Sequence, residues 1–246
     1  MNTEALSKVA IIPARGGSTG VPRKNLRPLA GKPLLWYIVQ AAKGAELIDL
    51  VVVSTEDEEI ANFANTLGVE VFRHPVYLST DRSPSFGVVE WALSELNRRS
   101  SNPEICVLLR ATSPFCQPID IDAALRLLCS NDKFDSVVSV SLAVGIHPMK
   151  LKRLSAHGEL RDAFEPEGST PIRRQELEPL YQRNAAIYAS RSEIIRSGKL
   201  WGSNCLAYVM PEERSLNINT EFQFKVANLL MEETLQNNRT GSKLKT

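Results

Sequence analysis

Apolar residues are spaced in two alternating patterns along the chain. Short runs rich in valine, isoleucine and leucine predict buried strands, and between them apolar positions recur every three or four residues, as on one face of a helix. This alternation is typical of βαβ units, so we predict an α/β fold, a three-layer sandwich with helices on both faces of a mostly parallel sheet. The strands are predicted at 9–14, 50–55, 70–73, 105–111 and 136–140, and the helices at 34–44, 58–67, 86–98 and 121–130.

The alternation breaks after residue 140. A polar stretch punctuated by prolines covers 145–182 and predicts irregular structure or an excursion from the sheet. The last helix begins with a capping box formed by Thr220 and Gln223. Strands are predicted again at 185–189 and 206–210, with a short helix at 192–197 between them and the last helix at 220–235. We assign a main domain to 1–142 and 183–237, an excursion to 143–182 and a flexible tail to 238–246.

The composition narrows the class of partner. The chain has 29 Lys and Arg against 28 Asp and Glu, so it lacks the basic field with which proteins bind nucleic acid, and a small-molecule partner is expected. Four cysteines and three histidines are too scattered for a zinc site or a disulfide framework, so we expect reduced thiols. The chain has neither a secretory signal nor an apolar run of about 20 residues, which predicts a cytoplasmic protein without a membrane partner.

A loop rich in glycine follows the first predicted strand. The run from Ile12 to Asn25 contains three glycines and three basic side chains, Arg15, Arg23 and Lys24. Glycines allow backbone N–H groups to approach phosphate oxygens, and the basic side chains would offset the charge of a triphosphate. The run has neither the Walker pattern nor G-x-G-x-x-G. Taken alone, it also fits a plain tight turn with solvated basic residues.

The longer pattern is more specific. Ala14-Arg-Gly-Gly-Ser-x-Gly-Val-Pro-Arg-Lys-Asn, followed by Pro28-Leu-Ala-Gly-Lys-Pro-Leu-Leu, resembles the signature of the acylneuraminate cytidylyltransferases (CMP-sialic acid synthetases), which are related to the CMP-Kdo synthetases. Further segments match the family in the same order: Val51-Val-Val-Ser-Thr, Leu108-Leu-Arg-Ala-Thr-Ser-Pro, His147-Pro-Met-Lys, Arg174-Gln, Asn184-Ala-Ala-Ile-Tyr and Asn217-Ile-Asn-Thr-Glu.

The resemblance implies a Rossmann-like nucleotidyltransferase that transfers CMP from CTP to the anomeric hydroxyl of a 2-keto-3-deoxy sugar acid of the sialic, legionaminic or pseudaminic type. Pyrophosphate would leave. It also implies a homodimer in which the excursion over 143–182 reaches the partner's active site. Lys24 and Arg15 would be catalytic, with Lys24 directed to the phosphates and Asn25 to the cytosine. The implied CTP site consists of Ala14, Arg15, Gly16, Gly17, Ser18, Lys24 and Asn25.

A sugar acid brings a carboxylate, which is best bound by a fixed cation such as the planar guanidinium of arginine. The resemblance directs Lys150, Arg174 and Asn184 to the sugar. For Lys150 and Arg173, a solvated surface charge is an equal alternative. The candidate cations are Arg110, Lys150, Arg173, Arg174 and Arg183, and the predicted sugar site is Arg110, Lys150, Arg174 and Asn184.

Three positions depart from the family pattern. Asn217 and Asn219 stand where the family has the aspartates that bind Mg²⁺, so the expected magnesium site is weakened, because an amide oxygen carries no net charge. Asn219 can also be interpreted as a residue that caps the last helix. Thr19 replaces a lysine, and Arg110 replaces a glutamine, which indicates a sugar other than plain N-acetylneuraminate or a second contact to its carboxylate.

Two hypotheses from different classes remain. The intact loop from Arg15 to Asn25 favours an active cytidylyltransferase with an altered sugar preference, whereas Asn217 and Asn219 favour a paralogue that binds CTP or sugar acid as a regulatory subunit without turnover. A glycosyltransferase that uses a nucleotide sugar would need an internal Asp-x-Asp motif. Asp120 and Asp122 have this spacing, but they are better interpreted as acidic residues at the start of a helix.

Overall fold

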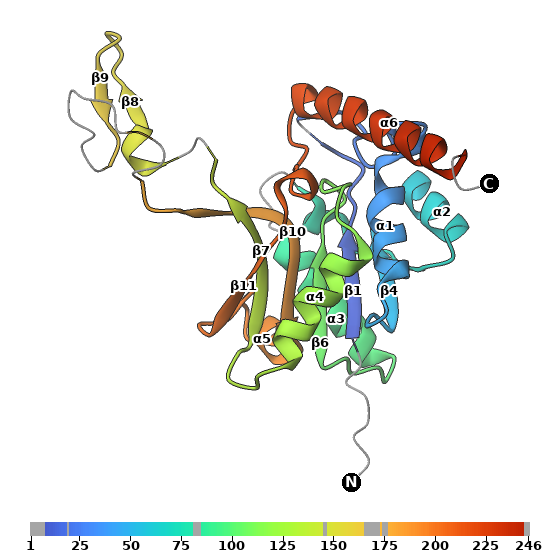
Figure 1. Ribbon diagram of the computed structural model, residues 1–246. Coiled ribbons are helices and arrows are strands. Elements are labelled where there is room, and N and C mark those ends of the chain that lie inside the picture. The colour runs from blue at the N-terminus through green and yellow to red at the C-terminus, as the bar shows by residue number, and fades with distance from the viewer. Residues whose placement is uncertain are drawn as a thin grey trace.

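A seven-stranded sheet forms the centre of the computed structural model, which describes residues 8–18, 20–80, 85–144, 147–164, 173 and 177–243 (Figure 1). The strand order is β11-β7-β10-β6-β1-β4-β5. Every neighbouring pair is parallel except those of β10, which runs antiparallel to both β6 and β7. The predicted mostly parallel sheet is therefore confirmed. The strands are β1 (Lys8–Pro13), β4 (Leu50–Ser54), β5 (Glu70–Phe72), β6 (Ile105–Leu109), β7 (Ser136–Leu142), β10 (Tyr181–Arg191) and β11 (Cys205–Val209).

Helices cover both faces of the sheet and confirm the three layers. Successive residues of a strand point to opposite faces, so Ala10 and Ile12 of β1 pack with one set of helices, and Val9 and Ile11 pack with the other. Residues of this kind are fully buried, which removes apolar surface from water and stabilises the fold. The first set is α1 (Leu34–Gly44), α2 (Glu58–Thr66) and α4 (Pro118–Cys129), and the second is α3 (Ser85–Arg98) and α5 (Ser192–Arg196).

The last helix, α6 (Glu221–Lys243), lies across the end of the sheet and packs on a small hairpin of β2 (Pro28–Leu29) and β3 (Lys32–Pro33) (Figure 1). Its predicted capping box is confirmed, since the Gln223 N–H donates to Thr220 Oγ1 at 3.2 Å. The helix continues to Lys243, so the tail predicted from residue 238 onwards is helical over its first part. The polar residues beyond 237 have low helix propensity, but intrinsic propensity is a small term and did not end the helix there.

An arm projects from the sheet where β7 leaves it (Figure 1). It carries a hairpin of β8 (Lys152–Leu154) and β9 (Leu160–Asp162), and the chain returns to the sheet through β10. The sequence predicted only an irregular excursion here, because three-residue strands are too short to show a period. No helix in the described ranges is both long and apolar enough to cross a bilayer.

Candidate active site

A cavity of about 640 Å³ opens at the carboxyl ends of β1 and β6, where open α/β sheets bind ligands. The Gly-rich loop after β1 and residues 110–112 after β6 line it, together with Asn219 from the segment before α6. Among its described lining residues are four basic side chains and no acidic one. An enclosed space with this charge favours anions. The basic residues are Arg15, Lys24, Arg110 and Arg183.

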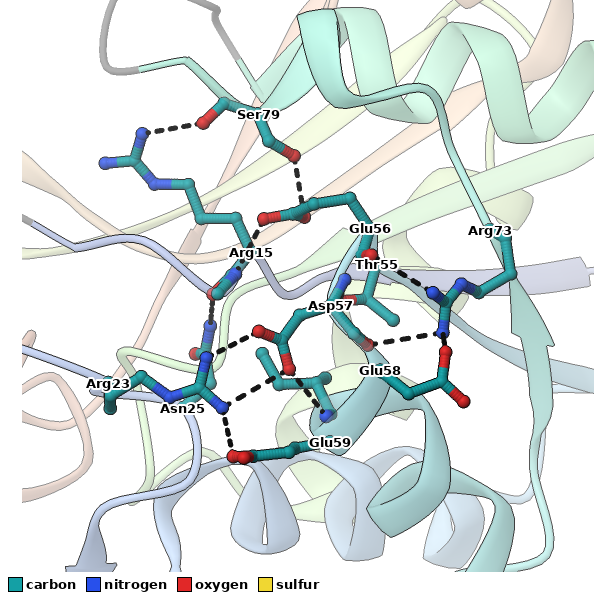
Figure 2. Close-up of polar contacts among 12 residues, drawn as sticks. Arg15, Arg23, Asn25, Thr55, Glu56, Asp57, Glu58, Glu59, Arg73 and Ser79 are labelled. Atoms are coloured by element: carbon teal, nitrogen blue, oxygen red, sulfur yellow. Dashed lines mark hydrogen bonds and ion pairs between the residues drawn. The ribbon is translucent and has the colours of Figure 1, made fainter.

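The Gly-rich loop is held from behind by an acidic side chain. The Gly16 N–H donates to Glu56 Oε1 at 2.8 Å, and Ser79 Oγ donates to the other oxygen of Glu56 at 2.7 Å (Figure 2). Arg15 Nη1 donates to the Ser79 carbonyl at 3.3 Å, which ties the loop to the same segment. These bonds fix the loop before any ligand binds, so little ordering cost remains for the ligand.

His74 completes this network. Its Nε2 lies 2.7 Å from Ser79 Oγ and its Nδ1 lies 2.8 Å from Ser54 Oγ. Burial lowers the pKa of His74 below its ordinary value, and the neighbouring carboxylate of Glu56 opposes this effect. His74 therefore supports the segment that braces Arg15, with both ring nitrogens engaged by serines.

Arg23 does not face the cavity, although the sequence grouped it with the cations that offset a triphosphate. Its backbone has a positive φ of 52°, and its guanidinium forms ion pairs with Asp57 and Glu59 (Figure 2). The hydrogen bond from Arg23 lowers the pKa of Asp57. Because two carboxylates already neutralise Arg23, the positive charge of the loop comes from Arg15 and Lys24.

Lys24 and Asn25, which the resemblance directs to CTP, line the cavity. Lys24 Nζ donates to the Ile218 carbonyl at 2.9 Å, and burial, followed by the charges of Arg110 and Arg15, lowers the pKa of Lys24. Asn25 Nδ2 donates to the Arg15 carbonyl at 2.8 Å. Three cations thus lie close together beside the glycines, which is the arrangement a polyphosphate requires. Ala14, Gly17 and Ser18 line the same cavity, whereas Gly16 is not among its described lining residues and donates its N–H to Glu56.

The predicted sugar-binding residues do not all lie in one cavity. Arg110 lines the large cavity, but Lys150 lines a smaller one of about 130 Å³ at the foot of the arm. Asn184 is buried: its Oδ1 accepts from Ser139 Oγ at 2.6 Å and its Nδ2 donates to Ser215 Oγ at 3.0 Å. The amide is therefore occupied in joining β10 to β7 and to the segment before α6. Arg174 lies outside the described residues.

The residues at the expected magnesium position do not fit a cation held by protein carboxylates. Asn219 lines the cavity, and Asn217 Oδ1 is buried without a hydrogen-bond partner. In the described ranges, no three residues among His, Cys, Asp and Glu gather as a metal site would require. The Asn219 N–H donates to Gln223 Oε1 at 2.8 Å, so this residue also takes part in capping α6. Two neutral amides supply too little charge to hold Mg²⁺ alone.

The sequence analysis did not identify several residues of the cavity wall, among them His74, Ser85 and Tyr188. The sequence could have indicated these residues only by their position relative to the predicted strands. His74 follows the carboxyl end of β5, the kind of place where ligands bind in such sheets. Tyr188 belongs to the matched segment that begins at Asn184, but its direction depends on an irregularity in β10 that no sequence pattern shows.

Two glycines of the loop provide a matched test of this geometry. A Cβ at Gly20 would lie 2.1 Å from the Asn219 carbonyl oxygen, whereas a Cβ at Gly17 would meet nothing within 4 Å. Gly20→Ala is expected to lower the free energy of unfolding by about 1–3 kcal/mol, as overpacking does. Gly17→Ala should unfold like the unaltered protein but bind CTP more weakly, because its methyl group enters the cavity. Thermal unfolding and calorimetry check both effects; equal melting temperatures for the two variants would contradict the close approach at Gly20.

Comparison with known sequences gives one consistent family. A family model described as cytidylyltransferase matches residues 9–225. The N-acylneuraminate cytidylyltransferase of Escherichia coli O18:K1:H7 is 33% identical over 220 residues, which is 89% of this chain and 51% of the relative. The enzyme of that name from Streptococcus agalactiae is 35% identical over 222 residues, 89% of this chain and 52% of the relative. The chain spans about half the length of the curated relatives it matches.

Solved structures agree on the fold. A CMP:2-keto-3-deoxy-manno-octonic acid synthetase complexed with CTP superposes with a TM-score of 0.67 at 17% identity, covering 93% of this chain and 99% of the other. A 4-diphosphocytidyl-2C-methyl-D-erythritol synthase from Anaerococcus prevotii gives a TM-score of 0.64 at 12% identity, with 93% and 97% covered. These likenesses show the fold. The family model that matches residues 9–225, together with relatives that are 33% and 35% identical, shows that the chain belongs to the cytidylyltransferase family.

Proposed function

We propose that this chain transfers CMP from CTP to the anomeric hydroxyl of a 2-keto-3-deoxy sugar acid and releases pyrophosphate. The observation that carries the proposal is the cavity at the carboxyl edge of the sheet, whose described wall has four cations and no acid. The reaction brings a triphosphate and a carboxylate together, so an enclosed site must neutralise both. The curated relatives of the chain are named N-acylneuraminate cytidylyltransferases, which supports this choice of acceptor.

The geometry supports roles in this reaction for several of the chain's own residues. The acceptor hydroxyl oxygen forms a bond to the α-phosphorus and gives up its proton to solvent, while the bond from that phosphorus to the pyrophosphate oxygen breaks. Arg15 and Lys24 stand beside the glycines of the loop, where they would bind the triphosphate and stabilise the charge that accumulates on the leaving pyrophosphate. The Glu56 bond to Gly16 keeps the loop in place during this step.

We propose that Mg²⁺ binds together with the triphosphate, since this ion is commonly held largely by substrate phosphates. Asn219→Asp, which adds a carboxylate to the cavity wall, is expected to lower the magnesium concentration needed for half-maximal rate several-fold. Rates measured across a magnesium titration check this, with Asn131→Asp in the loop before β7 as the matched control. If Asn219→Asp and the control respond alike, position 219 does not contact the metal.

The arm supports a homodimer. Leu154, Leu160 and Phe164 are 72%, 68% and 65% exposed on it, far from the central sheet (Figure 1). Apolar side chains in such numbers on a projecting element are typical of surfaces that bind another chain. We propose that they pack on a second copy of the chain and that the arm reaches the active site of that copy, as the resemblance to the family implies.

Pyrophosphate release tests the transfer directly. The protein is incubated with CTP, magnesium and either N-acetylneuraminate or 2-keto-3-deoxy-manno-octonic acid, with UTP and ATP as nucleotide controls. Release that requires both CTP and one acid establishes the transferase. The alternative, a paralogue that binds without turnover, is favoured by the neutral Asn217 and Asn219. It predicts no release with any acid, although CTP still binds in calorimetry.

A further inference from the structure

Strand β10 contains an irregularity that changes which residues face the cavity. Arg183 and Tyr188 are separated by an odd number of positions, so a regular strand would direct them to opposite faces of the sheet. The pairing of β10 with β7 shifts register between these two residues, and Ala185 between them has a positive φ of 62°. Such a bulge redirects side chains. Both Arg183 and Tyr188 consequently line the large cavity.

An aromatic stack holds the guanidinium of Arg183. Its Cζ lies 4.9 Å from the ring centroid of Trp201, and this ring stacks on Tyr188 with centroids 5.9 Å apart and an interplanar angle of 22°. Tyr188 is only 4% exposed, so the base of the stack is fixed in the core. A guanidinium on an aromatic face keeps its N–H groups free at its edge and loses little entropy when it binds a carboxylate.

Arg183 and Arg110 share a second property. In the part of the chain that the structure describes, neither guanidinium has a carboxylate partner, whereas Arg191 and Arg214 each have one and Arg23 has two. Arg183 belongs to β10 and Arg110 directly follows β6; β10 lies beside β6, and β6 lies beside β1. Arg110 therefore stands between Arg183 on one side and the Gly-rich loop on the other. Two unpaired guanidinium groups next to a triphosphate site point to a second anion in the same cavity.

We propose that Arg183, supported by Trp201, and Arg110 form a pair that binds the carboxylate of the acceptor and selects acids over their neutral analogues. The inference rests on the function proposed above and adds the residues that recognise the acid. It differs from the arrangement that the family resemblance implies, because both arginines come from the same chain and the cavity. Their guanidinium groups would also place the acceptor beside the phosphates bound by Lys24.

The test removes the negative charge from the acid by esterification and, separately, removes the guanidinium from the protein by substitution. Calorimetry measures the binding of N-acetylneuraminate and of its methyl ester to the protein saturated with the α,β-methylene analogue of CTP. The unaltered protein is expected to bind the acid roughly tenfold or more tightly than the ester, as hydrogen bonds between charged groups imply. Arg183→Ala should lose most of this preference, and Trp201→Leu should lose part of it, while both still bind the CTP analogue normally. Arg126→Ala on α4 is the matched control.

The possible results distinguish this inference from the transfer itself. If Arg183→Ala retains the preference for the acid, or loses affinity for the CTP analogue instead, the carboxylate pair is refuted. An unaltered protein that binds none of a panel of sialic, legionaminic, pseudaminic and 2-keto-3-deoxy-manno-octonic acids refutes it as well. An unaltered protein that prefers the acid to the ester but releases no pyrophosphate would refute the transfer and leave the pair standing, provided that Arg183→Ala removes the preference.

Discussion

Lys24→Ala is expected to lower kcat by about 100-fold or more, as for the loss of one donor that stabilises charge in a transition state. Lys24 Nζ lies on the wall of the cation-rich cavity and donates a hydrogen bond to the Ile218 carbonyl. Burial, followed by repulsion from Arg110 and Arg15, lowers the pKa of Lys24, so its positive charge is held there at a cost in free energy. A bound triphosphate would relieve that repulsion.

Steady-state rates of pyrophosphate release measure the effect of Lys24→Ala. Lys133→Ala, in the loop that leads into the amino end of β7, lies at the opposite edge of the sheet and serves as the matched control. Thermal unfolding of both variants shows whether the fold survives. Near-normal rates for Lys24→Ala in a folded protein would remove this residue from the phosphate site and with it the assignment of the Gly-rich loop.

The largest effect on stability is expected for Arg214→Met. Asp120 is fully buried, and it accepts hydrogen bonds from Arg214 Nη2 at 2.9 Å and from the Tyr208 hydroxyl at 2.9 Å. Burial, followed by this contact with Asp120, raises the pKa of Tyr208 to about 12. Without Arg214 the carboxylate remains buried and unpaired, which should lower the free energy of unfolding by about 3 kcal/mol.

Urea denaturation of Arg214→Met at neutral pH checks this loss. Arg126→Met is the matched control. Arg126 lies on α4, the helix that also carries Asp120, and pairs with Glu46 at the surface. Such an exposed pair contributes less than about 1 kcal/mol to stability. A loss for Arg214→Met as small as that of the control would show that Asp120 does not depend on its partner. The ion pair also anchors the segment that leads to Asn217 and Asn219, so the variant is expected to bind CTP less tightly.

Local patterns in the sequence were sufficient for most of the sheet and its helices, because each central strand is a short buried run between amphipathic segments. The direction of β10 could not be predicted in this way, since an antiparallel strand at the centre of a parallel sheet has the same apolar pattern. The hairpin of the arm was missed for a different reason: β8 and β9 are short and mostly exposed, so neither shows an alternation of buried and exposed positions.

The sequence predicted those parts of the candidate site whose residues follow one another along the chain. The loop from Ala14 to Asn25 contains both the glycines and the cations that a phosphate site needs, and most of its residues line one cavity. Asn184 shows the limit, because an amide in a matching motif can bind a ligand or join two strands, and here it contacts Ser139 and Ser215. Arg183 and Tyr188 reach the cavity only through the bulge at Ala185, which depends on tertiary structure.

A crystal structure of the protein with CTP and N-acetylneuraminate would test the central claim most directly. We predict the triphosphate over Gly16, Gly17 and Ser18 against Arg15 and Lys24, and the carboxylate of the acid between Arg110 and Arg183 in the same cavity. A triphosphate bound elsewhere, or an acid bound outside this cavity, would contradict the account.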